Sequence, residues 1–148
     1  MIVGVDLGVR SVHISTQDEN FTISSRKDVR YKEIDYIYRE FSSKTGEQCT
    51  FFIEEPVVAG ARNLRSSLQI AQVSGALMAT ARKSYLVPVS TWKKEVTGKG
   101  NSNKEQVSQW LKTVHPDLYE RTSGKQDFVD ATCIRLYGEI VESRVTAT

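Results

Sequence analysis

The sequence predicts an α/β protein with a mixed central sheet of about five strands flanked by helices, and three observations carry this prediction. The run from Ile2 to Gly8 is apolar and β-branched apart from one acid, as in a strand buried on both faces. Residues 11–15 and 21–24 alternate polar with apolar side chains, which predicts an antiparallel meander with the first strand. Apolar residues between 32 and 41 recur at the spacing of an amphipathic helix that covers a sheet.

The length of 148 residues suits one domain, which we expect to span residues 1–142, followed by a C-terminal tail at 143–148. The first strand starts at once, which leaves no signal peptide, and no apolar run approaches the roughly 18 residues of a membrane span. We therefore expect a cytoplasmic protein with no membrane partner. Cys49 and Cys133 lie in apolar segments and are expected to be reduced.

The distribution of charge is more informative than its sum. The formal net charge of +2 is too small to indicate a nucleic-acid partner by itself. No acidic residue occurs between Glu55 and Glu95, whereas several basic residues do. A one-signed block is typical of a surface that binds a polyanion, although a solvated helix face gives the same pattern. The basic residues of this block are Arg62, Arg65, Arg82, Lys83, Lys93 and Lys94.

Two acidic residues lie at the ends of buried strands. Asp6 ends the first apolar run, and Glu54 follows the strand predicted over residues 50–53. The order strand, helix, strand favours a parallel pair, which would bring both acids to the sheet edge where α/β proteins place their sites. Glu55 would then point to the opposite face. The alternatives are that Asp6 forms a turn into Gly8 and that Glu54 is a simple charged strand end.

The middle of the chain predicts a helix, a strand and a loop. A long helix is expected from about Asn63 to Ser84, and its apolar and small side chains would pack on the sheet or on a second subunit. Residues 85–89 predict a short strand, which Pro88 places near an edge or an end of the sheet. Residues 90–101, which include two glycines, are expected to form a mobile loop.

The predicted loop combines lysines with an aromatic residue, a composition that suggests contact with a DNA backbone. The lysines would bind phosphates, and Trp92 would pack or stack. Residues 102–105 predict a capping box that begins a helix, with Lys104 in its first turn. A role in solubility is the alternative for any single lysine. The candidate DNA-binding residues are Arg62, Arg65, Trp92, Lys93, Lys94, Lys99 and Lys104.

The last helix is predicted to open at Gln126 and to carry Asp127 and Asp130 on one face. Ile134 continues this face, so we expect both acids to point inward, with the helix dipole as the alternative explanation for their position. His13 lies in a predicted strand away from any evident ligand partner. We expect it to be a surface or packing histidine.

Four acids thus lie at the ends of otherwise apolar elements. Brought together, their charges would repel one another unless a divalent cation occupied the space between them. Oxygen ligands favour Mg²⁺ or Mn²⁺, and two such ions could activate a water and stabilise a leaving oxygen in phosphodiester cleavage. A nearby lysine, Lys104 first of all, would offset charge in the transition state. The four acids are Asp6, Glu54, Asp127 and Asp130.

Four segments of the sequence, taken in order, resemble the RuvC group of Holliday junction resolvases, which have an RNase H-like fold. The resemblance runs from residue 1 to about residue 141. Each motif alone is weak, and the ordered set of four is more specific. The segments are Gly4-Val5-Asp6-Leu7-Gly8, Phe52-Ile53-Glu54-Glu55-Pro56, Thr97-Gly98-Lys99-Gly100 with Lys104-Glu105-Gln106-Val107, and Asp127-Phe128-Val129-Asp130-Ala131.

The resemblance implies a metal-dependent endodeoxyribonuclease that resolves four-way DNA junctions by paired nicks and acts as a homodimer. It implies that residues 1–142 form a RuvC-like nuclease domain and that the helix from Asn63 is a candidate dimer interface. It also implies two Mg²⁺ ions in each active site, for which Mn²⁺ would substitute, and assistance by Lys104. The implied metal ligands and catalytic acids are Asp6, Glu54, Asp127 and Asp130.

One position and one segment depart from the pattern of bacterial members. Leu7 stands where they usually have proline, and the segment from Val57 to Gly60 lacks the aromatic wedge that they place near the junction centre. In this respect the chain is more similar to bacteriophage relatives, which accept various branched DNAs. A broader structure-specific nuclease that cuts Y-forks is therefore the alternative function.

Two further classes share parts of this pattern. Actin-like and sugar kinase ATPases also begin with a strand of the Gly-Val-Asp-Leu-Gly kind, but they need a second such domain and further phosphate-binding loops. A non-catalytic DNA-binding protein with the same fold would be expected to have lost one of the four acids. All four are present.

Overall fold

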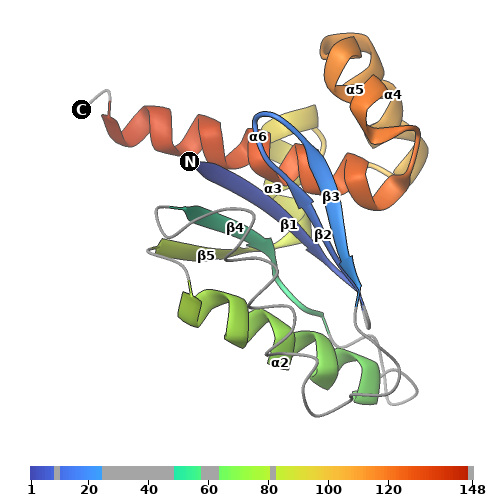
Figure 1. The fold of residues 1–148 in the computed structure, drawn as a ribbon. Coiled ribbons are helices and arrows are strands. Elements are labelled where there is room, and N and C mark those ends of the chain that lie inside the picture. The colour runs from blue at the N-terminus through green and yellow to red at the C-terminus, as the bar shows by residue number, and fades with distance from the viewer. Residues whose placement is uncertain (9–10, 25–48, 58–63, 81–82, 147–148) are drawn as a thin grey trace.

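A computed structural model describes residues 1–8, 11–24, 49–57, 64–80 and 83–146. Its centre is one sheet of five strands in the order β3-β2-β1-β4-β5 (Figure 1). The mixed sheet of about five strands that the sequence predicts is therefore confirmed. The strands are β1 (Ile2–Leu7), β2 (Ser11–Ser15), β3 (Asn20–Ser24), β4 (Thr50–Glu54) and β5 (Lys83–Val87).

The pairing of the strands also follows the sequence pattern. β1, β2 and β3 form the predicted antiparallel meander, while β4 runs parallel to β1 and β5 parallel to β4. β5 lies at an edge, as Pro88 directly after it predicts. Parallel pairing of β1 with β4 brings the carboxyl ends of both strands to one edge of the sheet.

Helices cover both faces of the sheet. Figure 1 shows α2 against one face and the long α6 across the other, with α3, α4 and α5 on the side of α6. No helix in the described part of the chain has the length and hydropathy needed to cross a bilayer. The helices are α2 (Leu64–Thr80), α3 (Val89–Thr97), α4 (Lys104–Val114), α5 (Pro116–Thr122) and α6 (Gln126–Thr146).

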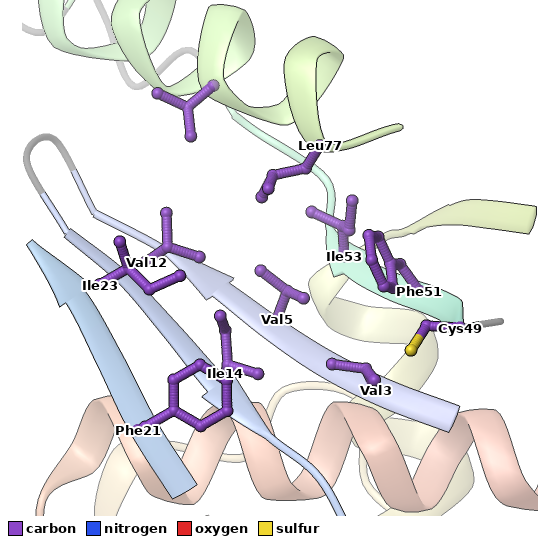
Figure 2. Packing of buried hydrophobic residues seen from close by; sticks show 11 residues of the cluster. Val3, Val5, Val12, Ile14, Phe21, Ile23, Cys49, Phe51, Ile53 and Leu77 are labelled. Atoms are coloured by element: carbon purple, nitrogen blue, oxygen red, sulfur yellow. The ribbon is translucent and has the colours of Figure 1, made fainter. Parts of the chain in front are cut away.

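The apolar core has two parts because successive side chains of a strand point to opposite faces. On one face, Phe51 and Ile53 of β4 belong to the same cluster as Leu77 of α2 (Figure 2). On the other face, Phe52 packs in a second cluster with Val129 and other residues of α6. The central strands are therefore buried on both sides, as their continuous apolar runs predict.

Two glycines allow α6 to lie close to the sheet. A Cβ atom on Gly4 of β1 would lie 2.0 Å from the carbonyl oxygen of Ala131. A Cβ atom on Gly138 of α6 would lie 2.4 Å from the ring of Phe52. Both distances are far below van der Waals contact, so these positions exclude any larger residue unless the backbone shifts.

The prediction of a mobile loop over residues 90–101 is wrong, because most of this segment is α3. The side chains of Trp92 and Val96 lie one turn apart on the buried face of the helix. This apolar pattern is short, and the two glycines that follow it favoured the prediction of a loop. The helix ends at Gly98, whose φ of 84° is the left-handed conformation of a C-cap. The preceding helix is also shorter than predicted, since α2 ends at Thr80 and β5 begins at Lys83.

The start of α4 is shifted by one residue from the predicted capping box. Asn103 is the N-cap, and its side chain accepts a hydrogen bond from the backbone of Gln106 while the Gln106 side chain accepts from the backbone of Asn103. Ser102 is engaged in the preceding turn, where its hydroxyl donates to the carbonyl of Lys99. Lys104 still occupies the first turn of the helix, as predicted.

Two further differences concern α5 and the end of α6, and one predicted helix is not described. α5 has no counterpart among the predicted elements. α6 continues to Thr146, so residues 143–146 are helical, and Arg144 forms an ion pair with Glu95 of α3. The amphipathic helix predicted over residues 32–41 lies outside the described residues.

Candidate active site

Asp6 and Glu54 lie side by side at the carboxyl ends of β1 and β4. Val5 is paired with Ile53 in the parallel register, and the two acids follow directly. Their carboxyl groups share a hydrogen bond. The structure therefore brings these two acids together at the edge where the sequence predicts them to meet.

Burial, reinforced by neighbouring acids, raises the pKa values of both Asp6 and Glu54. Burial, followed by the charges of Glu54, Asp130 and Asp127, raises the pKa of Asp6 to about 9. Burial and the charge of Asp130 raise the pKa of Glu54 to about 7, against the opposing effects of the hydrogen bond with Asp6 and the charge of Lys93. Without a bound cation, Asp6 thus holds a proton near neutral pH and donates it in a hydrogen bond to Glu54.

The first turns of α6 supply the other two acids, and they differ in environment. Asp130 is half-buried, and burial raises its pKa, which the hydrogen bond from Gln126 and the charge of Lys93 partly offset. Asp127 has a side chain that is 61% exposed, with Oδ2 3.4 Å from Nε2 of His13. The expectation that both acids point inward is therefore wrong for Asp127, because residues three apart on a helix differ by roughly 60° around its axis.

His13, which the sequence predicts to be a surface or packing histidine, packs edge-on against Phe128 and lies close to Asp127. It lies opposite Asp6 in the register of β1 and β2, and its ring nitrogens are each 3.1 Å from a hydroxyl oxygen, of Thr22 and of Ser11. Burial lowers the pKa of His13, and the charge of Lys125 lowers it further, whereas the charge of Asp127 raises it. The net decrease in pKa favours the neutral ring.

Two lysines lie close enough to the acids to influence them electrostatically. Lys104, exposed at the start of α4, stabilises the ionised form of Asp130. Lys93, half-buried on α3, stabilises the ionised forms of both Glu54 and Asp130. The sequence suggested only a DNA contact for Lys93, whereas the structure places its charge among the acids.

The other candidate DNA-binding residues are divided between elements. Lys94 and Lys99 are exposed on α3 and in the turn after it, on the side of α6. Arg65 is exposed on α2, which covers the opposite face of the sheet (Figure 1). Arg62 lies outside the described residues. Of the described residues in this block, Arg65 and the lysines of α3 therefore lie on opposite faces of the sheet.

Trp92 is not available to stack on a base, which corrects its assignment to DNA binding. Its side chain is 1% exposed and packs in the core cluster beneath α6. Lys93 Nζ lies 5.7 Å from the centroid of the Trp92 ring, a cation–π geometry that helps to hold this lysine. Trp92 therefore has a structural role beside the acids.

The donor chemistry of the acid cluster fits a divalent cation. Carboxylate oxygens suit Mg²⁺ and Mn²⁺, and burial together with neighbouring acids raises the pKa values of Asp6 and Glu54, so a bound cation would stabilise their ionised forms. Among the residues that the structure describes, no three acidic, histidine or cysteine side chains yet form a metal-binding group. The residues that would hold a cation are Asp6, Glu54, Asp127 and Asp130.

Comparison with solved structures identifies the class of fold. Thermus thermophilus RuvC superposes with a TM-score of 0.67 at 15% identity, covering 92% of this chain and 91% of the other. T. thermophilus RuvC in complex with Holliday junction substrate gives a TM-score of 0.65 at 14% identity, covering 92% and 90%. The fold is therefore RNase H-like, as expected from the resemblance of the motifs.

The family follows from a second comparison. The family model of crossover junction endodeoxyribonuclease RuvC matches residues 2–138, which is nearly the whole chain. The chain belongs to the RuvC family, and the resemblance noted in the sequence is confirmed. No curated protein sequence matched the chain.

Proposed function

We propose that this protein is a divalent-metal-dependent endonuclease that resolves four-way DNA junctions by paired nicks. The proposal is supported by the electrostatic coupling of Asp6 with acids of β4 and α6 in a chain of the RuvC family. The solved T. thermophilus relative holds a Holliday junction substrate, and the likeness covers 92% of this chain. This relationship supports branched DNA as the substrate class.

Each acid has a proposed role in binding metal. Asp6 and Glu54 would release their shared proton and hold the cation from the sheet, while Asp127 and Asp130 would hold it from α6. Two Mg²⁺ ions, or Mn²⁺ in their place, would supply an activated water and a stabilised leaving oxygen. Burial of three of the four acids limits competing water and strengthens their hold on a cation.

The lysines would act on the substrate phosphate. Lys104 and Lys93 lie near the acids and would offset the negative charge that develops as the phosphodiester is cleaved. Lys94 and Lys99 are exposed on the same side of the sheet and would contact flanking phosphates. Binding through such contacts depends on charge and duplex geometry rather than on base sequence.

Paired nicks require two active sites, so we propose a homodimer. α2 offers a surface for it, because Leu64 and Leu68 are 47% and 55% exposed on the helix that covers the face opposite α6. Because each leucine is already about half-buried, its burial against a second copy would contribute about half of the roughly 1.5 to 3 kcal/mol that complete burial provides.

A broader structure-specific nuclease is the second candidate, and one observation favours it. The segment from Val57 to Gly60 consists of small apolar residues and glycine, without an aromatic side chain to wedge into a junction centre. Selection of four-way junctions over other branches would then be weaker, as in the bacteriophage relatives that the sequence resembles.

The decisive experiment is cleavage of an end-labelled four-way junction, beside a Y-fork and a linear duplex, in Mg²⁺ or in EDTA. Asp6→Asn should abolish cleavage and retain binding, whereas Asp117→Asn, the same change at an exposed position of α5, should leave cleavage intact. Symmetric nicks limited to the junction support the resolvase. Equal cutting of the fork supports the broader nuclease, and no cutting in Mg²⁺ or Mn²⁺ refutes both.

A further inference from the structure

A chain of two hydrogen bonds connects α4 to one of the acids of α6. Gln126 Nε2 donates to Asp130 Oδ1 at 2.9 Å. Ser108 Oγ donates to Gln126 Oε1 at 3.2 Å. Ser108 lies one helical turn after Lys104, and Gln126 lies one turn before Asp130. The two bonds therefore join the helix that carries the active-site lysine to the acid that this lysine stabilises.

We infer that Gln126 is a positioning residue that holds the Asp130 carboxylate for metal binding and that Ser108 sets the orientation of the Gln126 amide. An amide side chain donates at one end and accepts at the other. Because the Ser108 hydroxyl donates to the amide oxygen, the NH₂ group is the end that faces Asp130. This inference rests on the proposed metal-dependent function.

The amide gives Asp130 a directional, neutral donor in addition to the charges of Lys93 and Lys104. Asp130 is half-buried and lies near Asp127, so its ionised form needs a donor. A neutral NH₂ group stabilises the carboxylate without placing a positive charge against the incoming cation. The bond also restricts rotation of the carboxylate, so that less conformational entropy is lost when metal binds.

The packing of α4 against α6 determines the positions of Ser108 and Gln126 relative to each other. Val107 and Leu111 of α4 are fully buried and belong to the same core cluster as Val129 and Cys133 of α6. Ser108 follows Val107 directly, and Gln126 lies less than one turn before Val129. The interhelical core thus fixes the distance between the serine and the amide.

The test compares three variants with the wild-type protein. Gln126→Leu keeps side-chain volume and removes both bonds, and Ser108→Ala removes only the bond that orients the amide. Gln109→Leu is the matched control, because Gln109 is exposed on α4 and its amide donates to Thr113 of the same helix. The readouts are Mn²⁺ affinity by calorimetry on the free protein, the Mg²⁺ dependence of junction cleavage, and thermal unfolding in EDTA.

We expect Gln126→Leu to weaken Mn²⁺ binding by about tenfold or more, within the range for residues that support metal ligands. The Mg²⁺ concentration for half-maximal cleavage should rise in parallel, and KM for the junction should stay unchanged. Ser108→Ala should shift both quantities in the same direction by a smaller factor. Gln109→Leu should match the wild type.

Two results would overturn the inference. One is Mn²⁺ affinity of Gln126→Leu within twofold of the wild type, and the other is an equal loss in Gln109→Leu. Should Gln126→Leu fail to fold in EDTA, wild-type affinity in a folded Ser108→Ala variant would be the refuting result. A wild-type protein that binds Mn²⁺ but cuts no junction would refute the proposed function, while the calorimetric comparison would still decide the role of Gln126.

Discussion

At the scale of single residues, the pair Asp6 and Glu54 couples stability to function. Their pKa values are raised mainly by burial, so the folded protein binds protons more tightly than the unfolded chain. The contribution of such a group to stability is complete below its unfolded pKa and is lost as pH rises through its folded pKa. In the absence of metal, stability from this pair should therefore fall as the pH increases from about 4 to about 9.

The first prediction follows from this linkage. Asp6→Asn cannot ionise, so in EDTA at pH 8 it should unfold at a higher temperature than the wild type, while at pH 4 the two should be similar. Each kcal/mol of difference corresponds to roughly 2 to 4 °C in a domain of this size. Calorimetric melting across this pH range measures the effect. Equal melting temperatures at pH 8 would contradict the raised pKa of Asp6.

The second prediction concerns Lys93 and Lys104, the two lysines whose charges act on the acids. Lys104→Met and Lys93→Met should each lower kcat for junction cleavage by about a hundredfold, because each removes charge that would stabilise the transition state. Lys94→Met is the control, since Lys94 is the exposed neighbour of Lys93, and it should weaken DNA binding slightly with little change in kcat. Single-turnover cleavage at saturating enzyme separates these effects. If kcat were unchanged in all three variants, neither Lys93 nor Lys104 would stabilise the transition state.

At the scale of elements, two helical glycines test the close packing of α6 on the sheet. Gly138 of α6 faces the sheet, and Gly75 of α2, whose Cβ position is open, is the control. Gly138→Ala should destabilise the protein by about 1 to 3 kcal/mol, because its Cβ would overlap the Phe52 ring. Gly75→Ala on α2 should stabilise the protein by about 0.5 to 1 kcal/mol, since nothing lies within 4 Å of its Cβ and alanine favours a helix. Urea denaturation measures both. A destabilising effect of equal size at both positions would contradict the packing described for α6.

The elements also show which parts of the fold the sequence could predict. The strands with long apolar or alternating runs were predictable, because hydrophobic pattern dominates their placement. α3 was not, because its buried face consists of a single pair, Trp92 and Val96, between a proline and two glycines. The N-cap of α4 was ambiguous because Ser102 and Asn103 are both good caps, and only the hydrogen bonds of Ser102 to the preceding turn decide between them.

The candidate site was predictable to a similar extent. Asp6 and Glu54 follow from parallel pairing, which a sequence can suggest by the order of its elements. His13 could not be assigned, since its contact with Asp127 joins β2 to α6, more than one hundred residues later in the chain. The exposure of Asp127 depends on the rotation of α6 about its axis, which the packing of Gly4 against Ala131 determines.

At the scale of the whole molecule, the proposed homodimer yields a further prediction. Leu68→Glu should convert the protein to a monomer in sedimentation experiments, because it places a charge on the apolar surface of α2. Junction cleavage should then change from paired to single nicks. Val145→Glu near the end of α6 is the control, since Val145 is 66% exposed and lies on the other side of the sheet. Loss of the dimer in the control but not in Leu68→Glu would place the interface elsewhere.

The contact between Gly4 and Ala131 has a consequence for biosynthesis. Within this chain β1 is synthesised well before α6, because the helix that covers one of its faces and carries Asp127 and Asp130 follows more than one hundred residues later. A nascent chain that ends before residue 126 therefore leaves that apolar face open and holds only Asp6 and Glu54. During translation, the ability to cut DNA would thus arise late and in one step, when α6 docks on the sheet.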